Sequence, residues 1–301
     1  MSSLRVDRDI GIMEMLQGYG EWPVVVLFAL ITQLGDVWFL LLLGGVLYVA
    51  GGELPGGGVA RRQGLFVLSL VLTYIAFIEA LKHFIVLPRP PGASVPPTVP
   101  GMPPMLEGVF TNITTAEGPG FPSGHALGTT MVWGGLAFVL DRGTRRLRFG
   151  IAGVIVVLVS ISRLVLGVHY TVDVVAGAGL GIVVLGVLYW LSDRGTDPER
   201  VLLVAVALGI VGLAIRITLD SVATAGSAIG AWLVWRGIAD VTPVYPRTRR
   251  EIVAGFVVLG IMGGLFAIIY ASEPSYLLLF LGATISAGGA TGAPLLGKRL
   301  A

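Results

Sequence analysis

Residues 162–191 read SRLVLGVHYTVDVVAGAGLGIVVLGVLYWL. A polar group that contains Arg163, His169 and Asp173 leads directly into an apolar run that carries no charge through Leu191. A run of roughly 20 apolar residues is long enough to cross the hydrocarbon core of a bilayer as a helix. This stretch therefore predicts a membrane-spanning helix that begins beside a charged and polar cluster.

The composition of the whole chain agrees with this stretch. Of its 301 residues, 55% are hydrophobic and 13% are charged, and the mean hydropathy is +0.88. Soluble domains carry about 25% charged residues, so a soluble globular protein is excluded. The net charge is only +2 and the basic residues are not clustered, so no nucleic-acid partner is expected. The chain has no cysteine, which excludes disulfides, zinc–thiolate sites and iron–sulfur sites.

Apolar runs separated by charged or Pro- and Gly-rich segments predict nine spans and an all-α fold, a polytopic transmembrane helix bundle. The spans are expected near 34–51, 64–87, 124–140, 147–167, 173–191, 201–219, 221–239, 252–271 and 275–295. Residues 1–21 lack the pattern of a cleavable signal peptide, and residues 1–33 are expected to form an N-terminal interfacial segment.

Positive charge is unequal between the two sides of this topology. Of the 20 Lys and Arg residues, six fall on one side and 14 on the other; the six are Arg5, Arg8, Lys82, Arg89, Arg163 and Arg216. Short cytoplasmic loops collect Lys and Arg, so we expect a multi-pass protein of the cell membrane with an extracytoplasmic N-terminus and a cytoplasmic C-terminus. The Pro-rich loop 88–122 then lies outside, and Asn112 within it begins an N-glycosylation triplet.

The first polar cluster on this outer side surrounds His169. Asp173 follows four residues later, so both side chains are expected on one face of a helix. A carboxylate there can accept the Nδ1 proton and leave Nε2 with a free lone pair as nucleophile or base. Arg163, at the outer end of the preceding span, adds a cation that suits a phosphate or carboxylate.

The second cluster is Ser123-Gly124-His125, directly before an apolar span. Ser123 and the proline before it are typical of a helix start. The free amides of Gly124 and His125 and the positive end of the helix dipole form an anion site. His125 beside a bound phosphate can act as a general acid.

Two further cations, Lys82 and Arg89, lie seven residues apart at the outer end of the second span. Pro88 and Pro90 are expected to break the helix there and to place Arg89 in the loop. The predicted topology brings eight residues to one membrane face: Lys82, Arg89, Ser123, Gly124, His125, Arg163, His169 and Asp173. Three cations, an anion-binding turn and a histidine with its carboxylate are typical of a phosphoryl-transfer site.

These residues form three motifs, Lys82-x6-Arg89-Pro90, Pro122-Ser123-Gly124-His125 and Ser162-Arg163-x5-His169-x3-Asp173. In order and spacing they resemble the signature motifs of the type 2 phosphatidic acid phosphatase (PAP2) superfamily of membrane-bound lipid phosphatases. The resemblance covers roughly residues 34–195. It implies a six-helix catalytic membrane core at 34–220. The predicted spans beyond this core are about three additional C-terminal transmembrane helices at 221–301.

The resemblance also implies a metal-independent mechanism with a phosphohistidine intermediate and no cofactor. In that mechanism His169 attacks phosphorus, Asp173 orients it, and His125 protonates the leaving group and later activates water. The remaining motif residues hold the phosphate: Lys82, Arg89, Ser123, Gly124 and Arg163. The expected partners are the bilayer and a lipid phosphate or pyrophosphate, such as a polyprenyl pyrophosphate or a phosphatidate-like lipid.

Three other functions remain open at the level of sequence. A phosphotransferase passes the phosphoryl group to an alcohol instead of water, and a hydrolase similar to glucose-6-phosphatase acts on a soluble phosphate ester. A transporter or an inactive binding protein is the non-enzymatic alternative, for which the C-terminal helices and intramembrane Glu79 and Arg216 are the relevant features. The sequence leaves the oligomeric state open.

Overall fold

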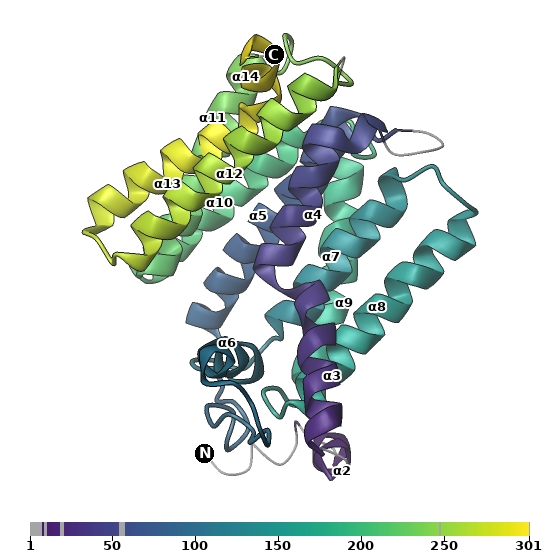
Figure 1. Cartoon of the computed structure of the whole chain (residues 1–301), viewed down its shortest axis with the longest axis vertical. Coiled ribbons are helices and arrows are strands. Elements are labelled where there is room, and N and C mark those ends of the chain that lie inside the picture. The colour runs from purple at the N-terminus through teal and green to yellow at the C-terminus, as the bar shows by residue number, and fades with distance from the viewer. Residues whose placement is uncertain (1–7, 9–10, 19–20, 54–57, 247, 301) are drawn as a thin grey trace.

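The computed structural model describes residues 8, 11–18, 21–53, 58–246 and 248–300. Within these ranges the regular secondary structure is helical, which confirms the predicted all-α bundle (Figure 1). In chain order the helices are α2 (Ile12–Gln17), α3 (Trp22–Thr32), η1 (Gln33–Gly35), α4 (Val37–Ala50), η2 (Gly51–Glu53), α5 (Arg61–Phe84), α6 (Pro104–Thr114), α7 (Gly124–Val139), α8 (Arg145–Val165), α9 (Thr171–Leu191), α10 (Pro198–Ile215), α11 (Leu219–Ile238), α12 (Arg249–Ala271), α13 (Tyr276–Thr291) and α14 (Ala293–Leu300).

Helix α5 lies at the centre of the bundle, packed against α4, α7, α10 and α11. Its buried residues Phe66, Val67 and Leu70 meet Leu127 and Met131 of α7 in the largest hydrophobic cluster of the described residues. Between membrane helices, close van der Waals packing is a main source of association. This packing holds α5, whose last turn carries the start of the first motif, in the middle of the bundle.

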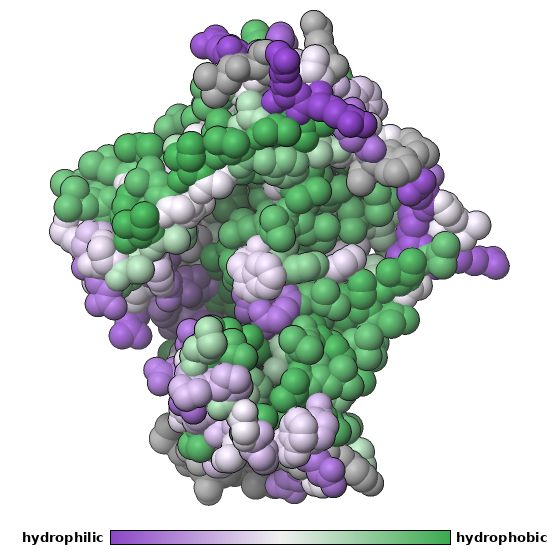
Figure 2. Space-filling view, in the orientation of Figure 1, coloured by the Kyte–Doolittle hydropathy of each residue, from purple (hydrophilic) through white to green (hydrophobic). Residues whose placement is uncertain are grey.

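The apolar surface of the bundle suits a membrane. Figure 2 shows a broad band of hydrophobic side chains, with hydrophilic side chains gathered mainly toward the ends of the helices. Within the described residues, α5, α8, α9, α10 and α12 are long and apolar enough to cross a membrane. Two bent pairs raise this number from five to seven if each is one span: α3–η1 with α4–η2, bent by 45°, and α13 with α14, bent by 61°.

A helix occupies each of the nine predicted ranges, and two of these helices, α7 and α11, fall outside this criterion of length and apolarity. Helix α7 has 16 residues, which is short for a hydrocarbon core of about 30 Å. Helix α11 is longer, but its Gly, Ala, Ser and charged residues make it less apolar than its neighbours. Both helices are largely enclosed by others, so their sequences were not required to face lipid along their whole length.

The C-terminal helices form a tight group of their own. A Cβ atom at Gly230 of α11 would lie 2.1 Å from the backbone oxygen of Thr284 in α13, so these two helices approach more closely than any larger residue permits. The predicted boundary at residue 220 falls near the start of α11, and that at residue 33 falls beside the bend between α3 and α4. The division of the chain into 1–33, 34–220 and 221–301 stays a prediction.

The loop 88–122 contains helix α6, which the sequence pattern did not reveal, and Asn112 lies within this helix. Two backbone hydrogen bonds close the loop. The amide of Gly120 donates to the carbonyl oxygen of Leu87 at 2.8 Å, and the amide of Ala116 donates to the carbonyl oxygen of Ala93 at 2.8 Å. The loop therefore returns the chain to the end of α5 just before α7 begins. As Figure 1 shows, α6 lies at one end of the bundle and the C-terminus at the other.

Candidate active site

His169 lies in the turn before α9, whose first residue is Thr171. The spacing of four residues predicted that His169 and Asp173 share one face of a helix. This is wrong, because His169 precedes the helix, yet the two side chains still lie close together. Asp173 folds back at the start of α9 and accepts a hydrogen bond from the Tyr170 amide at 3.0 Å. Its Oδ2 atom is 3.6 Å from His169 Nδ1, slightly beyond hydrogen-bond distance. Both side chains are buried, with exposures of 2% and 0%.

Arg8 holds the other oxygen of this carboxylate. Its Nη1 atom is 2.9 Å from Asp173 Oδ1, and its Nη2 donates to the carbonyl of Pro88. The guanidinium also lies over the ring of Tyr170, 4.7 Å from the centroid. Arg8 therefore joins the N-terminal segment to the first and third motifs within one buried contact.

Arg89 contacts the other side of the His169 ring. Its Nη1 atom is 3.1 Å from His169 Nε2 and 2.8 Å from the carbonyl oxygen of Val168. Its Nε donates to the carbonyl of Glu117 at 3.0 Å. A guanidinium nitrogen can only donate, so Nε2 must be the acceptor and the ring proton belongs on Nδ1, facing Asp173. The surroundings of His169 thus favour the tautomer whose Nε2 lone pair is available.

The second motif adjoins this histidine. Ser123 caps α7, its Oγ accepting from the Ala126 amide at 3.4 Å, and its own amide donates to the carbonyl of Asp173 at 2.9 Å. Helix α9 approaches this turn closely because Gly177 has no Cβ atom. A Cβ atom there would lie 2.5 Å from the carbonyl oxygen of Ser123. The first amides of α7, including that of Gly124, have no acceptor within the helix. The anion-binding turn expected here stays a prediction.

His125, in the first turn of α7, has a carboxylate of its own. Its Nε2 atom is 3.7 Å from Oδ2 of Asp36, the residue that precedes α4. The other Asp36 oxygen accepts from the Trp38 amide at 3.3 Å and so caps that helix. This pair is more open than the first, with side-chain exposures of 24% for His125 and 34% for Asp36.

The remaining two cations approach the same place from α5 and α8. Arg163 is buried at 3% exposure and donates to the hydroxyl of Thr32 at 2.9 Å. Lys82 is half-buried in the last turn of α5 and interacts electrostatically with both Arg89 and Arg163. The structure therefore brings all eight predicted site residues to one end of the bundle.

Burial and the neighbouring charges together determine the protonation state of His169. Burial holds the pKa of His169 well below its ordinary value of 6.5, and the positive charges of Arg89 and Arg163 lower it further. Burial also lowers the pKa of Arg89 to about 10, so this guanidinium remains charged at neutral pH. The site therefore presents a neutral imidazole among fixed cations. Within the described residues, no group of three His, Cys, Asp or Glu is arranged to hold a metal ion.

Two residues of the site were not singled out from the sequence, Arg8 and Asp36. Each carried a weak signal, since Arg8 is one of six cations on the predicted outer side and Asp36 interrupts an apolar run. Neither feature of the sequence indicates which residue is the partner. Arg8, for example, contacts Asp173, which lies 165 residues away in the chain.

Comparison with known proteins agrees with this geometry. Residues 63–197, which contain all three motifs, match the PAP2 superfamily. The chain is 40% identical over 85 residues to phosphatidylglycerophosphatase B of Bacillus subtilis (strain 168), a match that covers 26% of this chain and 39% of that relative. No solved structure matches the chain significantly. The similarity to the PAP2 superfamily thus extends over residues 63–197, the segment that contains the three motifs.

Proposed function

We propose that this protein is an integral-membrane phosphatase that hydrolyses a lipid phosphate or pyrophosphate through a phosphohistidine intermediate. The observation that carries the proposal is the setting of the His169 ring. Nδ1 faces the carboxylate of Asp173, and Nε2 accepts from Arg89. A buried neutral imidazole with a directed lone pair, surrounded by cations, is suited to attack an anionic phosphorus centre.

In the first step, the lone pair of His169 Nε2 forms a bond to phosphorus while the bond from phosphorus to the lipid oxygen breaks. His125 donates a proton to that leaving oxygen. Arg89 moves its hydrogen bond from Nε2 to a phosphate oxygen, where Arg163, Lys82 and the first amides of α7 also stabilise negative charge. Asp173 stabilises the positive charge that develops on the imidazole ring.

In the second step, water attacks phosphorus and the bond to Nε2 breaks, which releases inorganic phosphate. His125, now neutral, takes a proton from the attacking water and is restored for the next turnover. These residues alone supply the nucleophile, the acid–base group and the countercharge, so the proposed reaction requires no metal ion.

The lipid nature of the substrate is supported by the position of the site at the end of a bundle of apolar helices. A head group can reach such a site while its hydrocarbon chain stays in the bilayer. The name of the Bacillus subtilis relative indicates phosphatidylglycerophosphate as one substrate to test, beside phosphatidic acid and a polyprenyl pyrophosphate.

The test is phosphate release by the purified protein in detergent with EDTA, with these lipids and a soluble sugar phosphate as substrates. We expect release from a lipid phosphate that persists in EDTA and disappears in His169→Ala. An alkali-stable, acid-labile labelled enzyme would identify the phosphohistidine. Release that requires an added divalent ion, or that survives in His169→Ala, contradicts the mechanism.

We also propose that the site faces the outside of the cell, on the basis of the unequal distribution of Lys and Arg. The absence of cysteine allows a direct test in intact cells. Val95→Cys places a thiol in the loop beside the site, and Leu147→Cys places one at the opposite end of α8; both positions are exposed. A membrane-impermeant maleimide should label the first variant and not the second, and the reverse pattern contradicts the orientation.

A further inference from the structure

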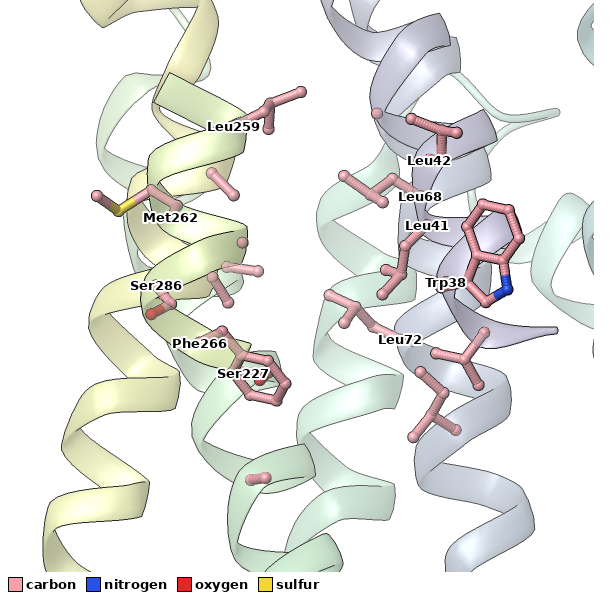
Figure 3. A pocket seen from close by; sticks show the side chains of 18 of the residues that line it. Trp38, Leu41, Leu42, Leu68, Leu72, Ser227, Leu259, Met262, Phe266 and Ser286 are labelled. Carbon is pink, nitrogen blue, oxygen red and sulfur yellow. The ribbon is translucent and has the colours of Figure 1, made fainter. Parts of the chain in front are cut away.

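A large apolar cavity lies between the core helices and the C-terminal helices. Its volume is about 880 Å³, and its walls come from α4, α5, α11, α12 and α13. Figure 3 shows Leu41, Leu68 and Leu72 on one side of the gap and Met262 and Phe266 on the other. Ligand cavities in proteins have volumes of about 300–1,000 Å³, so this one is large enough for a long hydrocarbon chain.

One end of this cavity leads toward the phosphate-binding residues. On α5 the lining residues include Leu68, Leu72, Ile75 and Glu79. Their spacing of three and four residues places them on one face of the helix. The next position on this row is Lys82, a cation of the first motif.

Two other contacts place the same end beside the second motif. The cavity begins on α4 at Val37, next to Asp36, the partner of His125. Ile78 also lines the cavity, and its Cγ1 atom lies 3.3 Å from the position that a Cβ atom on Gly124 would take. A single side chain therefore separates the cavity from the anion-binding turn of α7.

The charges at this end determine which part of a lipid can enter. The carboxylates of Glu79 and Asp220 line the cavity there. Glu79 lies 3.3 Å from His83 Nε2, and Asp220 accepts a hydrogen bond from the hydroxyl of Tyr270. Two carboxylates disfavour a phosphate inside the cavity, whereas the neighbouring cations favour it outside. The arrangement suits an uncharged chain that extends inward from a phosphate held at the site.

We infer that this cavity holds the hydrocarbon chain of the lipid phosphate substrate. The C-terminal helices, which lie outside the segment that matches the PAP2 superfamily, then complete the substrate site. This inference rests on the proposed function and adds chain length as a determinant of specificity. The driving force is the contact of the chain with the apolar walls.

Glycines on α12 allow the cavity to be filled without disturbing the fold. Gly260 and Gly263 line the cavity, and a Cβ atom at either position meets no other atom within 4 Å. Gly264 is equally free of contacts but does not line the cavity, which makes it a matched control on the same helix. The two test variants are Gly260→Phe and Gly263→Phe, and the control is Gly264→Phe.

We expect the test variants to lower kcat/KM for a long-chain lipid phosphate by about tenfold or more, because several methylene groups lose their contacts. Hydrolysis of p-nitrophenyl phosphate, which has no chain, should be unchanged, and the control should resemble the parent. Unchanged long-chain activity in both test variants would overturn the inference and leave the proposed function intact. Equal loss on both substrates would also overturn it, since the defect then lies at the phosphate site.

A second measurement does not depend on turnover. A long-chain alkyl phosphonate with a photoreactive group near the end of its chain is bound to His169→Ala and irradiated. Crosslinks should fall on residues 249–271 and 276–291, and Gly263→Phe should reduce them while Gly264→Phe does not. Crosslinks confined to other helices contradict the inference. Failure of the parent to hydrolyse any phosphate ester, in contrast, contradicts the proposed function itself.

Discussion

His169 and His125 each face a carboxylate at nearly the same distance, 3.6 Å to Asp173 and 3.7 Å to Asp36. The first pair is almost fully buried, whereas the side chains of the second are 24% and 34% exposed. A nucleophile benefits from a single tautomer and a fixed orientation, which burial and neighbouring hydrogen bonds impose. An acid–base group must exchange protons with a leaving group and with water, which requires access. The contrast is consistent with the proposed roles of the two histidines, which stay predictions.

The largest effect is expected when the buried pair is broken. Asp173→Asn removes the acceptor that favours the Nδ1 proton, so the ring is free to adopt the wrong tautomer. We expect kcat to fall by about 10⁴, as in other sites where a carboxylate orients a catalytic histidine. Phosphate release from the preferred lipid measures this. A loss of less than tenfold would contradict the assigned role of Asp173, provided the variant retains its thermal transition in detergent.

A smaller and substrate-dependent effect is expected at the open pair. His125→Ala should lower hydrolysis of a lipid phosphate by about 10² to 10⁴, the range of general acid–base catalysis. With p-nitrophenyl phosphate, whose leaving group needs no proton, the first step should persist and the second should be slow. Rapid mixing should then show a burst of p-nitrophenol. Equal impairment of the first step with both substrates would contradict the assignment of His125 as the acid.

Arg8 sharpens the comparison because it belongs only to the buried pair. Arg8→Met removes the hydrogen bonds to Asp173 and Pro88 and should lower kcat by about 10- to 100-fold, since small misplacements of a reacting group are costly. KM should change little, because the Arg8 guanidinium is taken up by Asp173 and Pro88. Arg8→Lys keeps the charge and should restore part of the rate. A rise in KM at constant kcat would point to a different role.

The corresponding change at the open pair should have less effect. Asp36→Asn removes a charge that is partly exposed, and such pairs contribute little, about 0–1 kcal/mol in most cases. We expect the rate on the lipid substrate to fall by less than about tenfold. A loss as large as that of Asp173→Asn would show that the two pairs are equivalent and would remove the basis of the comparison.

The pH dependence should show the smallest change. Because burial and neighbouring cations lower the pKa of His169, its neutral form persists below pH 6.5, and kcat/KM should fall on the acid side only below that value. Arg89→Gln removes one of these cations, so the remaining activity should begin to fall at a higher pH. An acid limb that does not move would indicate that another group, or the substrate, controls it.

Most helices of this protein were predictable because each is a local apolar run ended by charge, Pro or Gly. The break after α5 was also predictable, since Pro88 and Pro90 cannot continue a helix, and Arg89 does lie in the loop. Helix α6 was not, because its short sequence lies in a Pro-rich loop that lacks a clear period. Apolar sequence alone also does not distinguish a helix enclosed by protein, such as α7, from one that faces lipid.

The sequence by itself determined the class of fold, the three motifs and the end of the bundle at which they meet. These properties follow from local composition and from the alternation of the chain between two sides of a membrane. Only the tertiary structure decided that Arg8 holds Asp173, that Asp36 faces His125, that Nε2 of His169 accepts a hydrogen bond from Arg89, and that a cavity lies between the core and the C-terminal helices. Such contacts depend on how helices far apart in the chain pack together, which no local pattern of residues records.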